Sequence, residues 1–259
     1  MDYEYLSREK VNLLKSIEHK NITKELSVIL PTYEEAKNLR KFIKKLEENL
    51  KGIDYEIIVV DDNSQDGTKK LLLELVKNKR VFGLIRKKQR GLFSAILDGI
   101  KIAQGEYVQT MDSDFSHPPE KIKEFWKFRK EFEVVSGSRY VMGGGVNASF
   151  SRKFGSLILN KICSKIMGLK VKDVGGNFHL MKKEDFEKLK IRLPSVFGEF
   201  SFEWFYNSKK KRFKVKEVPF IYNFREEGES KMGDNKDFLK LLKISLLYLR
   251  RSFELRLFN

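Results

Sequence analysis

Two aspartates, Asp112 and Asp114, are the residues whose types and spacing best suit chemistry. Residues 106–111 favour a strand, and the polar stretch 115–119 ends it. In an open α/β sheet, ligands bind at the carboxyl ends of the strands. Two acids spaced i, i+2 on a turn can point at one position, because the turn breaks the alternation of a strand. This pattern is typical of a site for Mg²⁺, which shares one or two carboxylates with the phosphates of a substrate.

A second interpretation of these aspartates stays open on the tetrapeptide 111–114 alone. They could cap the helix expected near Pro119, because Asp is a common N-cap residue and Pro a common first residue of a helix. The choice depends on what the neighbouring strands bring to the same edge of the sheet.

The elements that position the acid pair follow a repeated alternation of strand and helix, which begins at Leu26 and predicts a mostly parallel sheet with flanking helices. The expected strands cover residues 26–30, 55–60, 81–85, 106–111 and 134–137. The expected helices between them cover residues 35–50, 69–78 and 92–104. Residues 55–60 are nearly all apolar, as expected of a strand buried on both faces. The fold class predicted is therefore α/β.

Polar loops follow three of these strands and should lie beside the acid pair. They supply Pro31, Tyr33 and Glu35, then Asp61 and Asp62, then Lys87 and Arg90. Carboxylates and cations gathered at one sheet edge predict a cleft for a charged substrate, with Lys87 among the substrate-binding residues. A Gly-rich Walker or Rossmann fingerprint does not follow the first strand, which argues against a P-loop NTPase or a dehydrogenase.

The bulk composition is that of a globular protein with a strongly basic surface. The chain has 259 residues and a net charge of +16, with 41% hydrophobic and 34% charged residues. The positive charge could serve nucleic acid, anionic lipid or phosphate-rich substrates, or reflect the surface composition of a thermophile. The single cysteine, Cys163, excludes an intrachain disulfide, and three scattered histidines do not predict a zinc site.

Two amphipathic stretches, 151–169 and 237–258, bear on the membrane. Each combines an apolar helical face with lysines or arginines elsewhere. Basic amphipathic helices of this kind can lie in the bilayer interface, and the alternative is packing on the domain or on a second subunit. A secretory signal is not expected, and every apolar run is far shorter than the ~20 residues that span a bilayer. The expected location is cytoplasmic, with peripheral contact to the cytoplasmic membrane face or a membrane subunit.

Several motifs in order carry a family resemblance. Residues 31–35 (Pro-Thr-Tyr-Glu-Glu), 60–64 (Val-Asp-Asp-Asn-Ser) and 112–114 (Asp-Ser-Asp) resemble the successive motifs of family 2 glycosyltransferases with the GT-A fold. Residues 135–140, 143–146 and 225–233 resemble the dolichol-phosphate mannose synthase branch of that family. The resemblance covers roughly residues 26–233 and implies a nucleotide-sugar donor.

The resemblance implies roles for individual residues. Pro31, Tyr33 and Glu35 stand where the family contacts the nucleotide base and ribose, and Asp62 stands where it holds the base beside the backbone of Val60. The implied Mg²⁺ or Mn²⁺ ligands are Asp112 and Asp114, with Ser113 between them. Arg139 would lie near the sugar diphosphate, and Arg225 and Lys231 resemble the pair that grips the phosphates of donor and acceptor. Asp112, Asp114, Arg225 and Lys231 are thus the catalytic candidates.

Departures from the family pattern leave some contacts open. Ser113 replaces the usual Ala, and residues 89–93 lack the family's Gly-Leu-Gly character. Residues 173–178 (Asp-Val-Gly-Gly-Asn-Phe) stand where many relatives have a Thr-Ser-Gly-Phe type of sequence, which leaves the choice of sugar or acceptor open. Arg139, Arg225 and Lys231 could instead be solvated basic residues. Glu203 could face the acceptor or lie on a helix surface.

The resemblance implies a GT-A glycosyltransferase domain at 26–233, and the amphipathic patterns on either side predict an N-terminal helical extension at 1–25 and a C-terminal amphipathic helix at 234–259. The expected reaction is inverting transfer of a hexose, mannose from GDP-mannose, to a polyprenyl or dolichyl phosphate. The alternatives are a UDP-sugar such as UDP-glucose, a hydroxyl acceptor, or an inactive scaffold. A nucleic-acid-binding module is disfavoured, because the lysines are mixed with acids and no binding motif is present. No nucleic-acid partner is expected.

Overall fold

The computed structural model describes residues 3–6, 22–88, 90–147, 150–191, 200–223 and 238–258. The strands are β1 (Tyr3–Leu6), β2 (Lys24–Thr32), β3 (Tyr55–Asp61), β4 (Val81–Arg86), β5 (Gly105–Thr110), β6 (Val134–Ser138), β7 (Gly145–Val146), β8 (His179–Lys182), β9 (Val215–Pro219) and β10 (Ile221–Tyr222). The helices are α2 (Ala36–Asn49), α3 (Thr68–Leu75), α4 (Leu92–Ile102), η1 (Pro119–Lys121), α5 (Ile122–Phe128), α6 (Phe150–Met167), α7 (Lys183–Leu189), α8 (Phe200–Lys210) and α9 (Phe238–Phe258).

The strands form an eight-stranded mixed sheet in the order β1-β4-β3-β2-β5-β8-β6-β9. Strands β4, β3, β2 and β5 are parallel to their neighbours, as the sequence predicts. Strand β8 is antiparallel to both β5 and β6, so β6 runs in the same direction as β5. A small separate sheet pairs β10 with β7. The prediction of an α/β fold with a mostly parallel sheet is confirmed.

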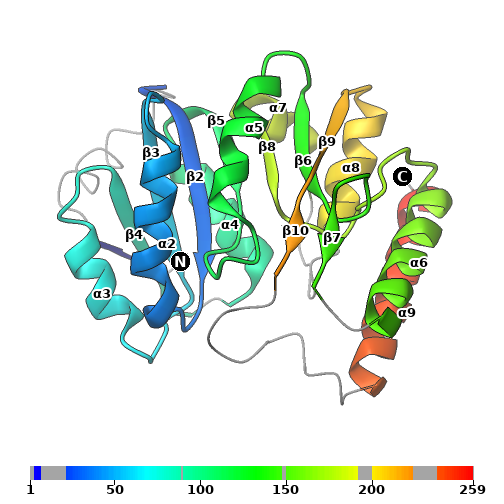
Figure 1. Ribbon diagram of the computed structural model, residues 1–259, viewed down its shortest axis with the longest axis horizontal. Helices are drawn as coiled ribbons and strands as arrows, with labels where there is room; N and C mark the ends of the chain where they lie inside the picture. The colour runs from blue at the N-terminus through cyan, green and yellow to red at the C-terminus, as the bar shows by residue number, and fades with distance from the viewer. Residues whose placement is uncertain are drawn as a thin grey trace.

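Helices cover both faces of the sheet because its central strands are apolar on both. Along β2, Val28 and Leu30 pack in one core cluster with residues of α2, α3 and α5. Ile29 points the other way, into the cluster that contains residues of α4, α7 and α8. In Figure 1, α2 and α5 lie in front of the sheet and α4 lies behind it. Packing on both faces of the sheet fixes the positions of the strand ends.

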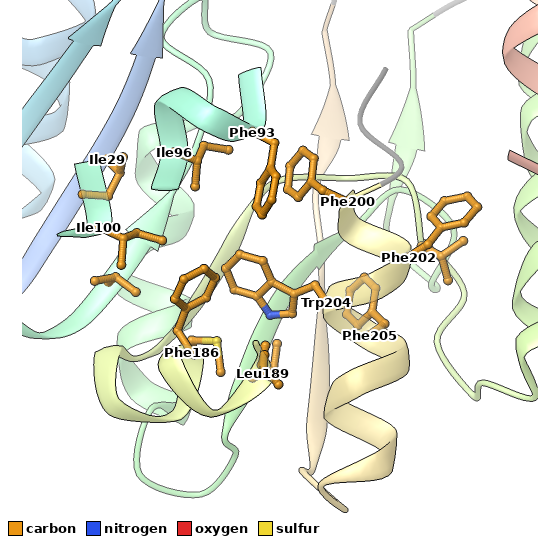
Figure 2. Packing of buried hydrophobic residues seen from close by; sticks show 14 of the residues in the cluster. Ile29, Phe93, Ile96, Ile100, Phe186, Leu189, Phe200, Phe202, Trp204 and Phe205 are labelled. Atoms are coloured by element: carbon orange, nitrogen blue, oxygen red, sulfur yellow. The ribbon is translucent and has the colours of Figure 1, made fainter. Parts of the chain in front are cut away.

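Aromatic residues connect the two halves of the sheet behind its centre. Phe93 of α4 stacks on Phe200 of α8, with ring centroids 4.4 Å apart and an interplanar angle of 13° (Figure 2). Trp204 lies next to Phe186, at 4.9 Å between centroids. Burying each such ring stabilises the fold by about 1.5–3 kcal/mol. The helix that follows β4 is thereby fixed to the helix that precedes β9.

Helices α6 and α9 lie side by side at one end of the molecule (Figure 1). Both carry large apolar side chains that stay exposed, namely Phe154, Leu157, Ile158 and Ile162 on α6, and Leu242, Leu246, Phe253 and Leu257 on α9. Among the described residues, none of the helices has the length and apolar composition needed to span a bilayer.

The N-terminal helix predicted over residues 1–25 is wrong for residues 3–6, which form β1 on the outer edge of the sheet. Its backbone pairs with β4 in antiparallel register, from Tyr3 opposite Arg86 to Leu6 opposite Gly83. Leu6 is buried against Gly83, where an added Cβ would lie 3.2 Å from the leucine. A strand satisfies the free backbone groups of the β4 edge, which a helix cannot do. Residues 7–21 lie outside the described part of the chain.

Candidate functional site

Four neighbouring strands end at one edge of the sheet. Thr32 of β2 lies opposite Asp61 of β3, and Ile29 lies opposite Thr110 of β5. The chain builds β3 and β4 on one side of β2 and then returns to place β5 on the other side. The point between β2 and β5, where the strand order reverses, is where open α/β sheets bind ligands. The residues that follow these strands therefore share the position expected of a binding site.

Strained backbone marks the same edge. Glu34, Asn63 and Phe115 follow β2, β3 and β5, and each has a positive φ, of 58°, 58° and 65° respectively. Non-glycine residues in this region cost about 1–3 kcal/mol each and cluster at functional sites. Three strand ends with the same unusual backbone indicate that the loops are shaped for more than connection.

The loop after β2 is tied to the loop after β3. The backbone N–H of Glu34 donates to Ser64 Oγ at 2.7 Å, and that of Glu35 donates to Thr68 Oγ1 at 3.2 Å. The buried Glu35 carboxylate accepts a hydrogen bond from Asn38 Nδ2 at 3.0 Å. These bonds fix the backbone that directly follows Tyr33.

Tyr33 is half-buried, and the guanidinium of Arg90 lies over its ring at 5.1 Å from the centroid. Pro31 and Val60 lie opposite each other in the β2–β3 ladder. Val60 is fully buried in the core, and its predicted backbone contact with a nucleotide stays a prediction. The sequence-predicted nucleotide positions on β2 and β3 are thus neighbours in space.

Asp62 is held by a buried arginine that the sequence analysis missed. Its Oδ1 accepts from Arg86 Nε at 2.7 Å, and its Oδ2 accepts from the Gly91 backbone N–H at 2.8 Å. Burial raises the pKa of Asp62, while the Gly91 amide and the Arg86 guanidinium oppose that rise. The carboxylate cannot rotate without breaking both bonds.

Arg86 is itself fixed by α4. Its Nη1 donates to Ser94 Oγ at 2.7 Å and to Asp98 Oδ2 at 3.3 Å, and its Nη2 donates to the Gly91 carbonyl at 2.9 Å. Tyr3 of β1 also hydrogen-bonds Asp98; burial and then this bond raise the pKa of Tyr3 to about 12. The sequence signal for this network was Asp98, an acid inside an otherwise apolar helical face, which requires a buried partner.

Lys87 follows Arg86 but does not join this network. Its side chain is exposed, and its Nζ lies 3.6 Å from Oε2 of Glu4 in β1. An exposed pair at this distance contributes little. Within the described residues, the charged partner of Lys87 is thus on the outer edge strand, and its predicted role in substrate binding stays a prediction.

Hydrogen bonds hold both aspartates of the acid pair in place. Asp112 Oδ1 accepts from Asn177 Nδ2 at 2.8 Å, and the Asp112 backbone N–H donates to His117 Nδ1 at 2.9 Å. Asp114 Oδ1 accepts from the Ser116 backbone N–H at 3.0 Å and from its hydroxyl at 2.5 Å. The side chain of Asp112 is 29% exposed, whereas Asp114 is almost fully buried.

The alternative role of these aspartates as helix caps is wrong. Neither η1 nor α5 has a side-chain hydrogen bond at its N-cap, and the N-cap residues are Pro118 and Lys121. Ser113 is buried between the two acids. The aspartates therefore shape their own turn and do not cap the helix that follows.

His117 is a neutral base buried under the turn. Its ring stacks on Phe178 at 4.7 Å and 8°, and burial lowers its pKa. Because Nδ1 accepts from the Asp112 amide, the ring proton is on Nε2. The sequence signal that was overlooked is the position of His117 within the same turn as the acids.

Asp112 and Asp114 provide two carboxylates as possible ligands of a cation. Within the described ranges, no group of three or more His, Cys, Asp or Glu side chains gathers round one point. Hard oxygen ligands from Asp112 and Asp114 fit Mg²⁺ and the similar Mn²⁺, which commonly share one or two carboxylates with the phosphates of a substrate. The donor set does not fit zinc, which prefers sulfur and imidazole ligands in closed sites.

Arg139 follows β6 at the same edge and is paired with Asp173. Its Nε and Nη2 donate to the two carboxylate oxygens, each at 2.7 Å, and its backbone N–H donates to Asp173 Oδ2 at 2.9 Å. Burial raises the pKa of Asp173, but the Arg139 guanidinium outweighs it and lowers that pKa below its ordinary value. The guanidinium also lies over the ring of Tyr222, at 5.7 Å. Its predicted contact with a sugar diphosphate stays a prediction.

Two other expectations are corrected or fall outside the structure. Glu203 is buried and pairs with Arg251 Nη2 at 3.1 Å, so it joins α8 to α9 and is not a surface charge. Arg225 and Lys231 lie outside the described residues, between β10 and α9. Their roles stay predictions.

Comparisons with known sequences agree with this geometry. Residues 27–190 match the family model described as Glycosyl transferase family 2. The chain is 37% identical over 214 residues to a dolichol-phosphate mannosyltransferase of Pyrococcus furiosus, covering 80% of this chain and 59% of that relative. It is 30% identical over 248 residues to a protein of the same name from Saccharomyces cerevisiae, covering 91% and 88%. The chain thus spans less than two thirds of the archaeal relative.

Solved structures share the fold. Glucosyl-3-phosphoglycerate synthase from Mycobacterium tuberculosis, in complex with Mg²⁺ and UDP, superposes with a TM-score of 0.63 at 13% identity, covering 94% of this chain and 83% of that one. The same enzyme with Mn²⁺, UDP and phosphoglyceric acid gives 0.64 at 14% identity, covering 90% and 78%. At this identity the likeness concerns the GT-A-like architecture alone.

Proposed function

The chain belongs to glycosyl transferase family 2, and from this premise we propose that it moves a hexose, mannose from GDP-mannose, to a polyprenyl or dolichyl phosphate with inversion. The observation that carries the proposal is the shared edge of β2, β3 and β5, which brings Tyr33, Asp62 and the acid pair together at the switch point. The names of two relatives support the choice of sugar and acceptor.

The nucleotide end of the donor would lie on β2 and β3. Asp62 presents a fixed carboxylate, which accepts a hydrogen bond from a ring N–H of guanine, and uracil carries a comparable N–H. The Tyr33 ring, with Arg90 over it, supplies a surface for stacking. Pro31 and the Val60 backbone would complete the contacts to the base, and Glu35 would contact the ribose.

The diphosphate would lie at the end of β5, with a divalent cation held by Asp112 and Asp114. Such a cation supplies positive charge where the leaving diphosphate becomes more negative. Ser116 and Asn177 keep the two carboxylates in place. Arg225 and Lys231 would add fixed positive charge to the phosphates of donor and acceptor, as Arg and Lys do in different geometries.

A phosphate acceptor is consistent with the histidines in the described part of the chain. A lipid phosphate is an anion at neutral pH and attacks without a general base, whereas a hydroxyl acceptor needs one. Both histidines in the described part of the chain are buried and hydrogen-bonded. Burial lowers the pKa of His179 to about 3, so it does not take a proton at neutral pH. These two histidines therefore do not supply the general base that a hydroxyl acceptor would need.

A lipid acceptor implies contact with a bilayer, which we assign to the exposed apolar residues of α6 and α9, called here the α6–α9 surface. Exposed basic residues accompany them, namely Lys153, Lys161, Lys165, Lys243 and Arg250. Apolar side chains flanked by cations suit the interface of an anionic membrane. The protein would bind peripherally on the cytoplasmic face, and a membrane subunit on this surface is the competing outcome.

The test is transfer of labelled sugar to a short-chain polyprenyl phosphate with Mn²⁺ present. We expect GDP-mannose to be used in preference to UDP-glucose, and Asp114→Ala to lose at least about 100-fold in rate, since removal of a charge-stabilising group costs about that much. Transfer from UDP-glucose alone would replace the donor assignment. Activity of Asp114→Ala near the wild-type rate would contradict the cation site.

A further inference from the structure

Asp112, the first aspartate of the acid pair, is held by two residues that lie outside the acid pair and outside the motifs predicted to bind the nucleotide. Asn177 holds its side chain, through Nδ2 to Oδ1 at 2.8 Å, and His117 holds its backbone N–H at 2.9 Å. Together these bonds fix the main chain and the carboxylate plane of Asp112. Among the described residues, the nearest basic group to Oδ2 is His117 Nδ1 at 3.8 Å, which already accepts from the amide, so within this part of the chain Oδ2 is open to a ligand.

The antiparallel insertion of β8 explains how Asn177 reaches the acid pair. Because β8 runs opposite to β5, its first residue, His179, lies beside Thr110, the last residue of β5. The carbonyl of Asn177 accepts from Thr110 Oγ1 at 2.6 Å, and the carbonyl of Phe178 accepts from the Gly137 amide at 2.8 Å. The backbone of Asn177 is therefore bonded to β5 independently of its side chain.

The amide side chain matters chemically because it cannot ionise. Asn177 is buried, and its donor stays protonated at every pH at which the protein folds. A donor to one carboxylate oxygen leaves the other for a cation and keeps the charge of the group. Partners of this kind orient metal ligands, and their loss typically lowers metal affinity about 10–100-fold.

We propose that Asn177 is a positioning residue that holds the Asp112 carboxylate ready for a divalent cation, with His117 fixing the backbone of the same residue. The proposal rests on the proposed function in that it takes Asp112 and Asp114 as the cation ligands. It assigns a role to Asn177, which stands in the segment where this chain departs from its family's usual sequence.

The test is a titration of the full chain with Mn²⁺ alone, in which electron paramagnetic resonance reports the free ion. We expect Asn177→Ala to weaken Mn²⁺ binding about 10–100-fold. The matched control is Asn207→Ala, because the Asn207 amide also donates to one acceptor and joins α8 to the last residue of α7, through the Leu189 carbonyl at 2.8 Å. Equal Mn²⁺ affinity of Asn177→Ala and Asn207→Ala would overturn the proposal.

A charge-bearing variant tests whether the side chain at position 177 lies next to the cation held by Asp112. Asn177→Asp places a second carboxylate beside Asp112, so the two repel until a cation binds. We expect Mn²⁺ to raise its unfolding temperature by more than it raises that of the wild type. A smaller or equal Mn²⁺-induced shift would contradict the proposal, even if Asn177→Ala does not fold.

The contact between His117 and the Asp112 backbone N–H can be tested by a separate pair of variants. His117→Asn keeps an acceptor near the position of Nδ1, whereas His117→Leu removes it, so Mn²⁺ affinity should be higher in the first variant than in the second. The reverse order, or equal affinities, would remove His117 from the proposal.

Asp112→Ala distinguishes the two levels of inference. If this variant binds Mn²⁺ as the wild type does, the cation site of the proposed function fails. If it loses Mn²⁺ binding while Asn177→Ala keeps wild-type affinity, only the positioning role fails.

Discussion

Two buried Arg–Asp pairs, one in each half of the sheet, present opposite charges at the same edge. After β3 and β4, the arginine is inside: the Arg86 side chain is 0% exposed and that of Asp62 is 10% exposed. After β6, the acid is inside: the Asp173 side chain is 1% exposed and that of Arg139 is 17% exposed. The first half therefore offers a carboxylate to a ligand, and the second half offers a guanidinium.

The reversal suits the two ends of a nucleotide sugar. A carboxylate accepts a hydrogen bond from a base N–H, whereas a guanidinium binds phosphate oxygens. The acid pair at the end of β5 lies between these halves in the strand order. The chemistry of each ion pair is the same, and the exposed partner decides what the pair can bind.

The largest effect is expected where both partners are most buried. Arg86→Met should lower the free energy of unfolding by about 3–5 kcal/mol, because it leaves the buried Asp62 without its cation and Asp98 with Lys101 as its cation. Urea unfolding measures this loss. Lys182→Met is the control, since the exposed Lys182–Glu106 pair should contribute at most about 1 kcal/mol. A loss for Arg86→Met no larger than the control would break the comparison.

Asp173→Asn should cost less, about 1–3 kcal/mol, because water reaches the partly exposed Arg139. The pKa of Asp173 is lowered in the folded protein, so its stabilisation is present above the pKa of the unfolded side chain and lost as pH falls through the folded value. The difference between wild type and variant should be steady from about pH 5 to 7 and shrink below about pH 4. Urea unfolding at several pH values checks this, and a difference that grows in acid would contradict the ion pair.

The ligand preference of the first half gives a smaller effect. Asp62→Asn should weaken binding of GDP about tenfold, through loss of one charged acceptor. Asp98→Asn is the matched control, because it also removes a carboxylate from Arg86 but lies on α4 away from the edge. Calorimetry of both variants with GDP decides. Equal losses would mean that Asp62 acts only through the arginine network.

The smallest change in stability is expected on the α6–α9 surface. Leu246→Glu and Phe253→Glu alter exposed residues and should shift the free energy of unfolding by no more than about 0.5 kcal/mol. They should nevertheless reduce cosedimentation with anionic vesicles. Leu73→Glu, an exposed apolar position on α3, is the control and should bind vesicles as the wild type does. Equal vesicle binding by all three variants would favour a protein partner for this surface.

The parallel half of the sheet was predictable because its strands are long and apolar. The helix predicted over 35–50 is observed as Ala36–Asn49, and the strand predicted over 55–60 as Tyr55–Asp61. Strands β8 and β9 were not predicted. Strand β8 has four residues and includes Lys182, and β9 has five residues and includes Lys216 and Glu217, so neither shows a clear alternation of apolar and polar residues. The pairing of both strands depends on neighbours that are distant in sequence. Strand β1 was mistaken for helix because only the free edge of β4 favours a strand there.

The candidate site shows the same division. The strand ends located Tyr33, Asp62 and the acid pair, because parallel strands place their carboxyl ends together. Partners such as Arg86 and Asn177 could not be found, since a hydrogen bond between Asp112 and a residue 65 positions away follows from the β5–β8 pairing. The sequence specified which groups could do chemistry, and the tertiary structure specified what holds them.

The most direct test is a crystal structure with GDP-mannose and Mn²⁺, with anomalous scattering used to locate the ion. The account predicts a manganese peak in contact with Asp112 and Asp114, the diphosphate beside it and the base next to Asp62. A donor bound elsewhere, or both aspartates turned away from ion and nucleotide, would contradict it.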